Sequence, residues 1–288
     1  MSYQAAFFKT LFRISFFSKR YFGFYKRIFL PFHFFKGEVK TIYFRGFKLK
    51  LHLDDWIQQN IYFKGSYENI ELNWVEKNLN TGDVFIDIGA NIGVYTLTAA
   101  QKIAQGKVYA FEPFEQNHNS LLSNIELNTF QNIQVEKLAI AECKKNISLF
   151  YDEADKNLGM VSAYNASMKN ETIIKAVALD DYAAENKINK IAIVKMDIEG
   201  NELFALQGMK NILNYHQPKL LIEIDAAILS RTTYVAKDIF DFLDALNYAP
   251  FYFNQSGYLV EKEPAVTVTR NVVFLPKKNL KTKQPQQL

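Results

Sequence analysis

The stretch "DVFIDIGANIGVYTL", residues 83–97, decides how this chain folds. Its first half is a run of β-branched and aromatic residues, which predicts a buried strand over Val84–Ile88. Gly89 and Gly93 follow, and a helical period then begins. Glycine in such a turn permits positive φ angles and lets a ligand lie directly against the backbone. The stretch therefore predicts a strand and a helix with a binding site where the strand ends.

The remainder of the chain continues this alternation of strands and helices. Strands are expected at Val84–Ile88, Lys107–Glu112, Ile133–Ile140, Ala192–Ile198, Leu220–Ile224, Pro250–Phe253 and Asn271–Leu275. Helices are expected at Val94–Gln105, Glu115–Leu127, Glu202–Leu213 and Ala236–Leu246. Strands that are buried on both faces and joined by helices predict an α/β fold with a doubly wound, mostly parallel seven-stranded sheet. The last two strands lack a helix between them, which predicts an antiparallel hairpin at the sheet edge.

Three regions are expected along the chain. Residues 1–53 form a basic aromatic arm and a hairpin, residues 54–276 form the main domain, and residues 277–288 form a polar, disordered tail. Between Asn146 and Tyr182 lies an insertion with strand-like ends and a loose middle. Lids over ligand sites are often built in this way.

The charge of the chain is concentrated in the arm. The net charge is +4, but residues 1–50 hold eleven Lys and Arg and one acid, a charge of +10, which leaves −6 for the other 238 residues. On a helical wheel, Lys9, Arg13, Arg20 and Arg27 share one side, and Phe7, Leu11, Ile14, Phe22, Tyr25 and Phe29 lie opposite. Two interpretations of residues 5–35 stay open: an amphipathic helix on an anionic membrane, or an aromatic arm packed on the domain or on the second subunit of a homodimer. We expect no nucleic acid partner, because the acidic remainder would repel a polyanion.

Cysteine content and hydropathy limit the cellular context. The single cysteine, Cys143, excludes an intramolecular disulfide and a cysteine-rich metal site. No apolar run reaches the length of about 18 residues that a bilayer span needs. We expect a cytoplasmic protein that is either free or peripheral at the inner membrane face.

The ends of the first two strands carry the candidate binding residues. In a parallel sheet, ligands bind beyond the carboxyl ends of the strands. A dinucleotide site would read G-x-G-x-x-G, but here Asn91 occupies the space that a diphosphate would need, which favours a nucleoside without one. Glu112 follows Gly93 by nineteen residues, and a carboxylate there can accept both hydroxyls of a ribose. Asp87 would place a further acid beside a cationic ligand or the loop N–H groups.

Several segments resemble the FkbM-type family of S-adenosylmethionine-dependent methyltransferases. They are "VFIDIGANIGVYTL", "VYAFEPFEQNHNSLLSNIELN", "IVKMDIEGNELFALQGM" and "PKLLIEID", and the resemblance covers roughly Asp54 to Asp225. It implies a class I methyltransferase fold with seven strands, S-adenosylmethionine as cofactor, and mostly O-methylation of sugars and other small hydroxylated metabolites.

The resemblance also implies roles for individual residues. The loop around the methionine part of the cofactor is matched by Asp87, Gly89, Asn91 and Gly93, and the ribose-binding acid by Glu112. The backbone beside adenine is matched by Ala139, and a lid-side segment near the cofactor by Tyr67 and Glu68. The acids that face the transferred methyl are matched by Asp197 and Glu199. A hydroxyl acceptor must lose a proton, so we expect Asp197 to act as base or orienter, with Glu199 and Glu223 assisting. Glu199 could instead cap the next helix.

The expected function is transfer of a methyl group to a hydroxyl of a sugar, a glycolipid precursor or a similar small metabolite. No metal is expected, although Asp197, Glu199, Glu223 and Asp225 together could hold magnesium. Two alternatives remain. A nicotinamide-dependent sugar reductase would use a similar sheet, and a non-catalytic, membrane-associated binding protein would use the arm.

Overall fold

The large sheet sets the architecture of the molecule. The computed structural model describes residues 3–152, 168–254, 256–261 and 270–280. Within these ranges the sheet contains β3 (Val84–Ile88), β4 (Lys107–Phe111), β5 (Ile133–Glu136), β9 (Ile191–Met196), β10 (Lys219–Ile224), β11 (Tyr248–Phe253), β12 (Leu259–Val260) and β13 (Arg270–Pro276). Their order is β12-β11-β13-β10-β9-β3-β4-β5, parallel from β10 to β5 and antiparallel from β10 to β12. The expected doubly wound α/β fold with an antiparallel edge is confirmed, but the sheet has eight strands in the described ranges instead of the predicted seven, because β12 adds to the antiparallel edge.

One predicted strand is divided between two sheets. The segment Ile133–Ile140 forms β5 and then β6 (Ala139–Ile140), which leaves the large sheet. β6 pairs with β8 (Asn170–Val177), and β8 pairs with β7 (Lys145–Tyr151). β5 is the edge strand of the large sheet, so the chain after it is free to find its hydrogen bonds elsewhere. The insertion therefore begins and ends in strands as predicted, while its middle, residues 153–167, lies outside the described residues.

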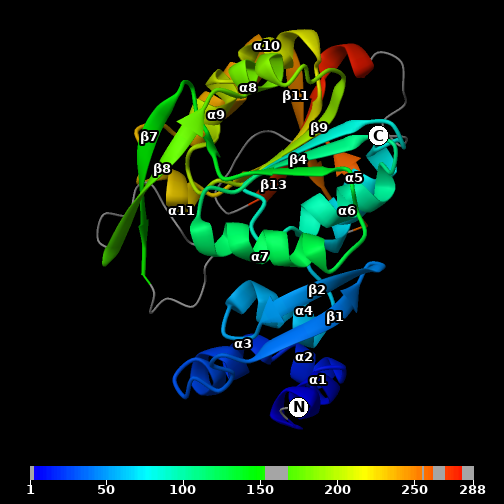
Figure 1. Cartoon of the computed structure of the whole chain (residues 1–288), viewed down its shortest axis with the longest axis vertical. Helices are drawn as coiled ribbons and strands as arrows, with labels where there is room; N and C mark the ends of the chain where they lie inside the picture. Colours follow the sequence, from blue (N-terminus) through cyan, green and yellow to red (C-terminus); the bar gives the residue numbers. More distant parts are fainter. Residues whose placement is uncertain (1–2, 153–167, 255, 262–269, 281–288) are drawn as a thin grey trace.

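Two hydrophobic cores lie on the two faces of the sheet. Successive residues of a strand point to opposite faces, so Phe85 belongs to one core and Ile86 to the other. The Phe85 core includes α5 (Asn69–Asn78) and α6 (Val94–Lys102), and the Ile86 core includes α8 (Leu179–Glu185), α9 (Glu202–Gln207), α10 (Lys210–Tyr215), α11 (Ala226–Leu229) and α12 (Ala236–Ala245). Figure 1 shows α6 and α7 (Glu115–Glu126) on the side of the sheet toward the arm, and α8 to α10 on the other side. The predicted helix Glu202–Leu213 is thus two helices, α9 and α10.

The predicted hairpin is present and is fixed to the domain by asparagine side chains. β1 (Val39–Phe44) and β2 (Phe47–His52) pair in antiparallel register. The N–H groups of Lys48 and Lys50 in β2 donate to Asn128 Oδ1 at 2.9 Å and to Asn124 Oδ1 at 2.7 Å. These bonds satisfy the free edge of the strand, because side-chain amides replace a neighbouring strand.

The arm is not a single amphipathic helix. It consists of α1 (Tyr3–Leu11), α2 (Ser15–Ser18), α3 (Tyr21–Phe24) and a π-helical turn, η1 (Tyr25–Phe29). Ile14 has an extended backbone, which interrupts the helix and resets the direction of the side chains after it. Phe22, expected on the apolar side, is therefore exposed, while Phe12, just after the end of α1, is buried. The single-helix prediction is wrong because a wheel assumes one uninterrupted axis.

The arm packs on α4 (Trp56–Lys64), as one of the two interpretations expects. Phe12, Tyr21 and Phe29 are buried in the same hydrophobic core as Phe63 of α4 and Phe85 of the sheet. Every helix in the described ranges falls short of the length and apolarity that a bilayer span requires.

The C-terminal tail begins later than expected. Residues 277–279 form a 3-10 helix, and the Lys277 ammonium lies 2.6 Å from Asp244 Oδ1 of α12. Residues 281–288 lie outside the described residues.

Candidate cofactor and acceptor site

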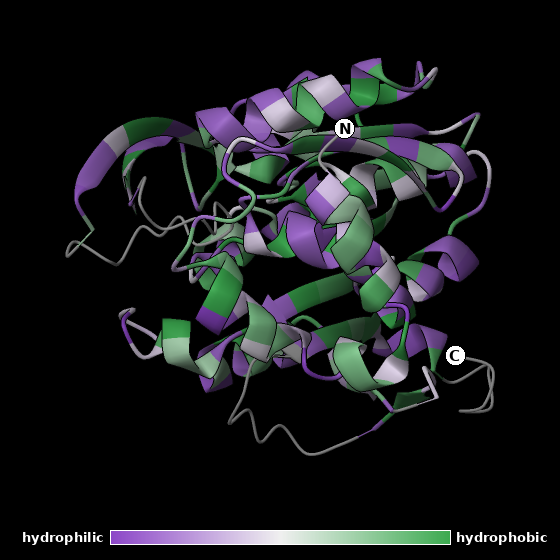
Figure 2. Cartoon of the chain, turned by 90° about the horizontal axis from the view of Figure 1, so that it is seen from below, coloured by the Kyte–Doolittle hydropathy of each residue, from purple (hydrophilic) through white to green (hydrophobic). Residues whose placement is uncertain are grey.

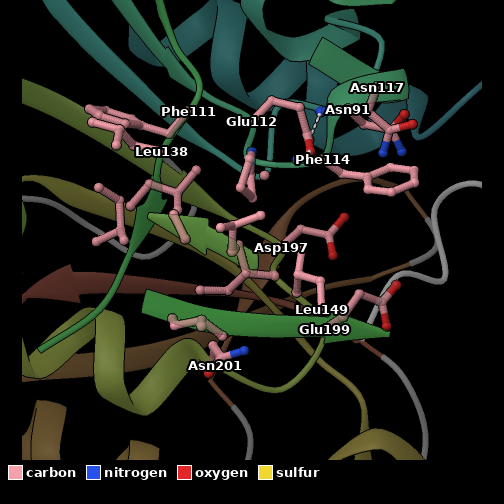
Figure 3. Close-up of a pocket in the computed structure, with 18 residues that line it drawn as sticks. Asn91, Phe111, Glu112, Phe114, Asn117, Leu138, Leu149, Asp197, Glu199 and Asn201 are labelled. Atoms are coloured by element: carbon pink, nitrogen blue, oxygen red, sulfur yellow. Dashed lines mark hydrogen bonds between the residues drawn. The ribbon is translucent and has the colours of Figure 1, made fainter. Parts of the chain in front are cut away.

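A cavity opens at the carboxyl ends of β3, β4 and β9 (Figure 3). It encloses about 720 Å³ together with its open mouth. Its polar lining comes from the segments after these strands, namely Gly89 and Asn91, Glu112, and Asp197 with Glu199. The structure therefore brings residues from three strand ends to one site, as expected for a parallel sheet.

Neighbouring atoms leave no space for a Cβ at Gly89 or Gly93 in the loop after β3. Gly89 has a φ of +78°, and a Cβ there would lie 1.8 Å from the Asp197 carbonyl oxygen. Gly93 has a φ of +94°, and a Cβ there would lie 2.5 Å from Leu121 Cδ1 of α7. Gly89 lines the cavity, whereas Gly93 lies behind it and allows α6 to begin against α7. The two glycines shape the cavity by letting its walls approach each other.

Glu112 is held in place by the two loops beside it. Its carboxylate accepts the Asn91 N–H at 2.8 Å and the Phe114 N–H at 3.0 Å. Figure 3 shows the bond to Asn91. The side chain is buried, and burial raises the pKa of Glu112 to about 7. A carboxylate has about four acceptor positions, so two N–H donors leave room for ligand hydroxyls.

The opposite side of the cavity is apolar. Phe114 packs with Leu149 of β7 and Ile174 of β8, and Ala139 of β6 packs against them. All four line the cavity. The strands at the two ends of the insertion therefore contribute, with Phe114, an apolar part of the cavity wall.

A cluster of carboxylates lies between the cavity and a smaller hollow beside it. Asp197 and Glu199 line both spaces, whereas Glu223 and Asp225 line only the hollow. Glu223 is hydrogen-bonded to Asp197, and the charge of Asp197 together with burial raises the pKa of Glu223. Burial and the Asp197 charge also raise the pKa of Glu199. A hydrogen bond between two carboxyl groups requires a proton, and these pKa shifts assign it to Glu223.

A buried lysine balances this negative charge. Lys195 of β9 is the register neighbour of Asp87 in β3. Its ammonium lies 3.5 Å from Asp197 Oδ2 and 3.9 Å from Asp87 Oδ1, and it donates to the Gly89 carbonyl at 3.2 Å. Burial alone would lower the pKa of Lys195, but the carboxylates, first of all Asp197, raise it. Lys195 therefore stays charged and links the carboxyl ends of β3 and β9.

Comparison with known proteins assigns the chain to a family. The sequence profile of the methyltransferase FkbM domain matches residues 87–250, which is more than half of the chain. The chain belongs to the FkbM methyltransferase family. The match includes the loop after β3, Glu112 and the carboxylate cluster, so the resemblance stated from the sequence is confirmed.

The chain is similar to curated relatives and to a solved structure. The hexuronic acid methyltransferase AglP of Haloferax volcanii is 27% identical over 149 residues, which cover 51% of this chain and 57% of AglP. The 31-O-demethyl-FK506 methyltransferase FkbM of Streptomyces tacrolimicus is 27% identical over 161 residues, which cover 46% of this chain and 62% of that protein. The crystal structure of methyltransferase FkbM from Methylobacillus flagellatus KT aligns with a TM-score of 0.45 and 17% identity over 75% of this chain and 52% of that one. The chain spans about three fifths of the length of these curated relatives.

The predicted residues occupy three places in this FkbM domain. Gly89, Asn91, Glu112, Ala139, Asp197 and Glu199 line the cavity, Glu223 lines the adjoining hollow, and Tyr67, Glu68, Asp87 and Gly93 line neither space. Asp87 is fully buried and accepts the Thr96 hydroxyl at 2.6 Å. It therefore faces Lys195 and α6 instead of the cavity.

Tyr67 and Glu68 approach the carboxylate cluster from the loop before α5. The Tyr95 hydroxyl of α6 donates to Glu68 Oε2 at 2.6 Å. Burial raises the pKa of Tyr67, and the charges of Glu68, Asp197 and Glu223 raise it further. The causes of this shift place Tyr67 close to Glu68, Asp197 and Glu223.

Sequence reasoning missed Lys195 and Tyr95, and it offered a wrong alternative for Glu199. A lysine inside the apolar run "IAIVKM" was the visible signal for Lys195. Glu202, not Glu199, accepts the free N–H of Gly200 at 3.1 Å before α9. Within the described ranges, no group of His, Cys, Asp and Glu side chains has an arrangement that could hold a metal ion.

Proposed function

We propose that the chain is an S-adenosylmethionine-dependent O-methyltransferase whose acceptor is a hydroxyl of a sugar, a glycolipid precursor or a similar small metabolite. The observation that carries the proposal is the lining of the FkbM-domain cavity. Its charged residues are Glu112, Asp197 and Glu199, and none of the described residues that line it is a lysine, arginine or histidine. Such a lining favours a ligand with positive charge and disfavours a diphosphate.

The residues of the cavity fit the proposed cofactor in three parts. The free acceptor positions of Glu112 suit the two ribose hydroxyls. The apolar wall around Ala139 and Phe114 suits the adenine ring. The carbonyl-lined turn at Gly89 and the Asp197 carboxylate suit the ammonium and sulfonium charges of the methionine part. When bound, S-adenosylmethionine supplies a methyl group already activated by its sulfonium.

The carboxylate cluster then has to position the acceptor and remove its proton. The Asp197 carboxylate accepts the proton of the acceptor hydroxyl, and the Lys195 ammonium, 3.5 Å away, orients that carboxylate. Protonated Glu223 donates to Asp197 and fixes its orientation. Alignment of acceptor and donor can contribute about 7 to 11 kcal/mol, so these residues act mainly by positioning.

A polyhydroxylated acceptor suits the carboxylate cluster at the edge of the cavity. Asp197 and Glu199 line the cavity, and sugar hydroxyls are donors that pair well with carboxyl oxygens. AglP, a relative of this chain, is a hexuronic acid methyltransferase. We therefore favour carbohydrate hydroxyls, including those of glycolipid precursors, over amine acceptors.

Ligand titration tests this proposal against both alternatives. Isothermal titration with S-adenosylhomocysteine and with NADH compares the two cofactor classes directly. We expect S-adenosylhomocysteine to bind the unmodified protein and NADH not to bind. Glu112→Gln should weaken binding at least about tenfold, since a hydrogen bond to a charged group contributes about 1.5 to 3 kcal/mol. Glu115→Gln is the matched control, because its exposed carboxylate pairs only with Lys137 at the surface.

Transfer of a labelled methyl group from S-adenosylmethionine to glucuronic acid and to neutral sugars completes the test. Binding followed by transfer to oxygen supports the proposal. NADH binding without S-adenosylhomocysteine binding would establish the reductase instead. If neither compound bound, a non-catalytic binding protein would be the better description.

A further inference from the structure

The aromatic residues of the arm fall into a buried set and an exposed set. Phe12, Tyr21, Phe29 and Phe35 are at most 2% exposed. The exposed apolar residues between Ala5 and Phe35, here called the exposed set, are Phe7, Ile14, Phe16, Phe22, Leu30 and Phe32, which are between 40% and 73% exposed. Packing on the domain therefore accounts for only part of the apolar surface of the arm.

The buried set fixes the arm on α4. Tyr21 stacks on Trp56 with ring centroids 5.5 Å apart, and its hydroxyl donates to Gln59 Oε1 at 2.9 Å. Phe12 meets Phe63 with centroids 5.7 Å apart. The exposed set therefore projects from a packed base, and its apolar surface stays outside after folding is complete.

Cations surround the exposed set. Arg13, Lys19, Arg20, Lys26, Arg27 and Lys36 are exposed, and residues 1–37 contain no Asp or Glu. The Arg20 guanidinium lies 3.7 Å from the Phe16 ring centroid, and the Lys26 ammonium lies 4.7 Å from that of Phe22. Seen from the end of the molecule at which the arm lies, hydrophobic and hydrophilic residues are interleaved along the ribbons (Figure 2).

We propose that the exposed set and the surrounding cations form a docking surface for an anionic lipid bilayer. Rings and aliphatic side chains enter the interface between headgroups and acyl chains, while lysine and arginine remain at the level of the lipid phosphates. Cations near an anionic surface add to the attraction one by one, so six exposed cations suffice for reversible binding. This proposal depends on the arm alone and not on the proposed methyl transfer.

Other occupants fit this surface less well. The core of an interface between two protein copies is depleted of charged residues, whereas here cations lie directly over the rings. Single-stranded nucleic acid would stack on aromatic rings, but Ile14 and Leu30 belong to the exposed set and offer no ring. Acyl chains accept aromatic and aliphatic side chains alike.

Vesicle flotation measures the proposed docking directly. The full chain is mixed with vesicles of phosphatidylcholine alone or with about 30 mol% phosphatidylglycerol, at about 50 mM and about 500 mM NaCl. Phe16→Ala with Phe32→Ala removes two exposed rings, and Arg13→Gln with Arg27→Gln removes two exposed cations. Tyr215→Ala is the matched control, because Tyr215 is 80% exposed on α10 at the opposite end of the molecule (Figure 1).

The proposal expects binding to the anionic vesicles at low salt and at least about tenfold weaker binding for either double variant. Tyr215→Ala should bind as the unmodified chain does, and thermal unfolding should show that all variants remain folded. Equal binding to neutral and anionic vesicles, or no binding to either, would overturn the proposal. Binding of a single-stranded oligonucleotide in the absence of vesicles would also overturn the proposal. So would a dimer that forms without vesicles and that Phe16→Ala with Phe32→Ala dissociates.

Discussion

Lys195 and Asp197 form an ion pair, 3.5 Å from Nζ to Oδ2, at the end of β9, in which the lysine is buried and the carboxylate half-buried. Removing the cation leaves the fully buried Asp87 without a counter-charge, which typically costs about 3 to 5 kcal/mol. Lys195→Met should lower the free energy of unfolding by about this amount at pH 8 and by clearly less near pH 5, where Asp87, whose pKa is raised by burial, can take up a proton. Urea denaturation at the two pH values measures the difference.

The control for this prediction is an exposed pair. Lys137→Met removes the partner of Glu115, 3.0 Å away at the surface, and should change the free energy of unfolding by less than about 1 kcal/mol. An equal cost for Lys195→Met at both pH values would mean that lost packing, not unbalanced charge, is the cause.

Gly89 is confined by the Asp197 carbonyl and not by its φ angle alone. Gly89→Ala places a Cβ 1.8 Å from that oxygen, whereas Gly37→Ala, at a similar φ of +72°, meets nothing within 4 Å. Gly37→Ala should cost about 1 to 2 kcal/mol, the usual strain of a left-handed residue. Gly89→Ala should cost clearly more and abolish S-adenosylhomocysteine binding, because the loops after β3 and β9 must separate. Thermal unfolding and titration of both variants check this, and equal losses of stability would contradict it.

The fold was predictable where local pattern and global structure agree. Val84–Ile88 reads as a buried strand, and Gly89 marks its end, whatever the rest of the chain does. The break within Ile133–Ile140 was not predictable, because it depends on the pairing of Ala139 with Ala176 in β8, more than thirty residues later. The single-helix prediction for the arm was wrong because the backbone of Ile14 is extended, and a helical wheel includes no such break.

The sequence predicted which strand ends form the candidate site, but not which side chains contact one another there. Glu112 and Asp197 follow strands and were found by position. Lys195 was visible as a lysine in an apolar run, but which carboxylates face it depends on the register of β9 against β3. Tyr95 belongs to α6, and its bond to Glu68 joins residues twenty-seven positions apart. Sequence position therefore finds the ends of strands, and only the fold shows which side chains meet between them.

Glu112 should make cofactor binding dependent on pH. Burial raises its pKa to about 7, so below that pH the carboxyl is largely protonated and offers fewer acceptor positions to the ribose hydroxyls. Affinity for S-adenosylhomocysteine should be constant above about pH 8 and fall toward tenfold per pH unit below about pH 6. Titration calorimetry of the unmodified chain and of Glu112→Gln tests this. The variant should bind more weakly and show a flat profile, and the same slope in both proteins would assign the pH dependence to another group.

Glu223 should lower the stability of the protein at neutral pH. Its pKa in the folded chain is raised above the ordinary value of 4.5, first by the Asp197 charge and then by burial. The folded state therefore holds the Glu223 proton more tightly than the unfolded state, and stability falls as pH rises above about 4.5 toward the folded-state pKa. Glu223→Gln removes this penalty and keeps a donor for Asp197. It should raise the free energy of unfolding by about 1 to 3 kcal/mol at pH 8, with little gain at pH 4.5.

The same variant separates stability from catalysis. Because Glu223 lies in the hollow outside the cavity, S-adenosylhomocysteine should bind Glu223→Gln about as well as it binds the unmodified chain, while methyl transfer declines. Glu171→Gln, at an outward-facing position of β8, is the control and should change neither quantity. Urea denaturation at pH 4.5 and pH 8 measures the effect of Glu223→Gln on the free energy of unfolding. A variant less stable than the unmodified chain at pH 8 would show that Glu223 is charged there and that its pairing supports the fold.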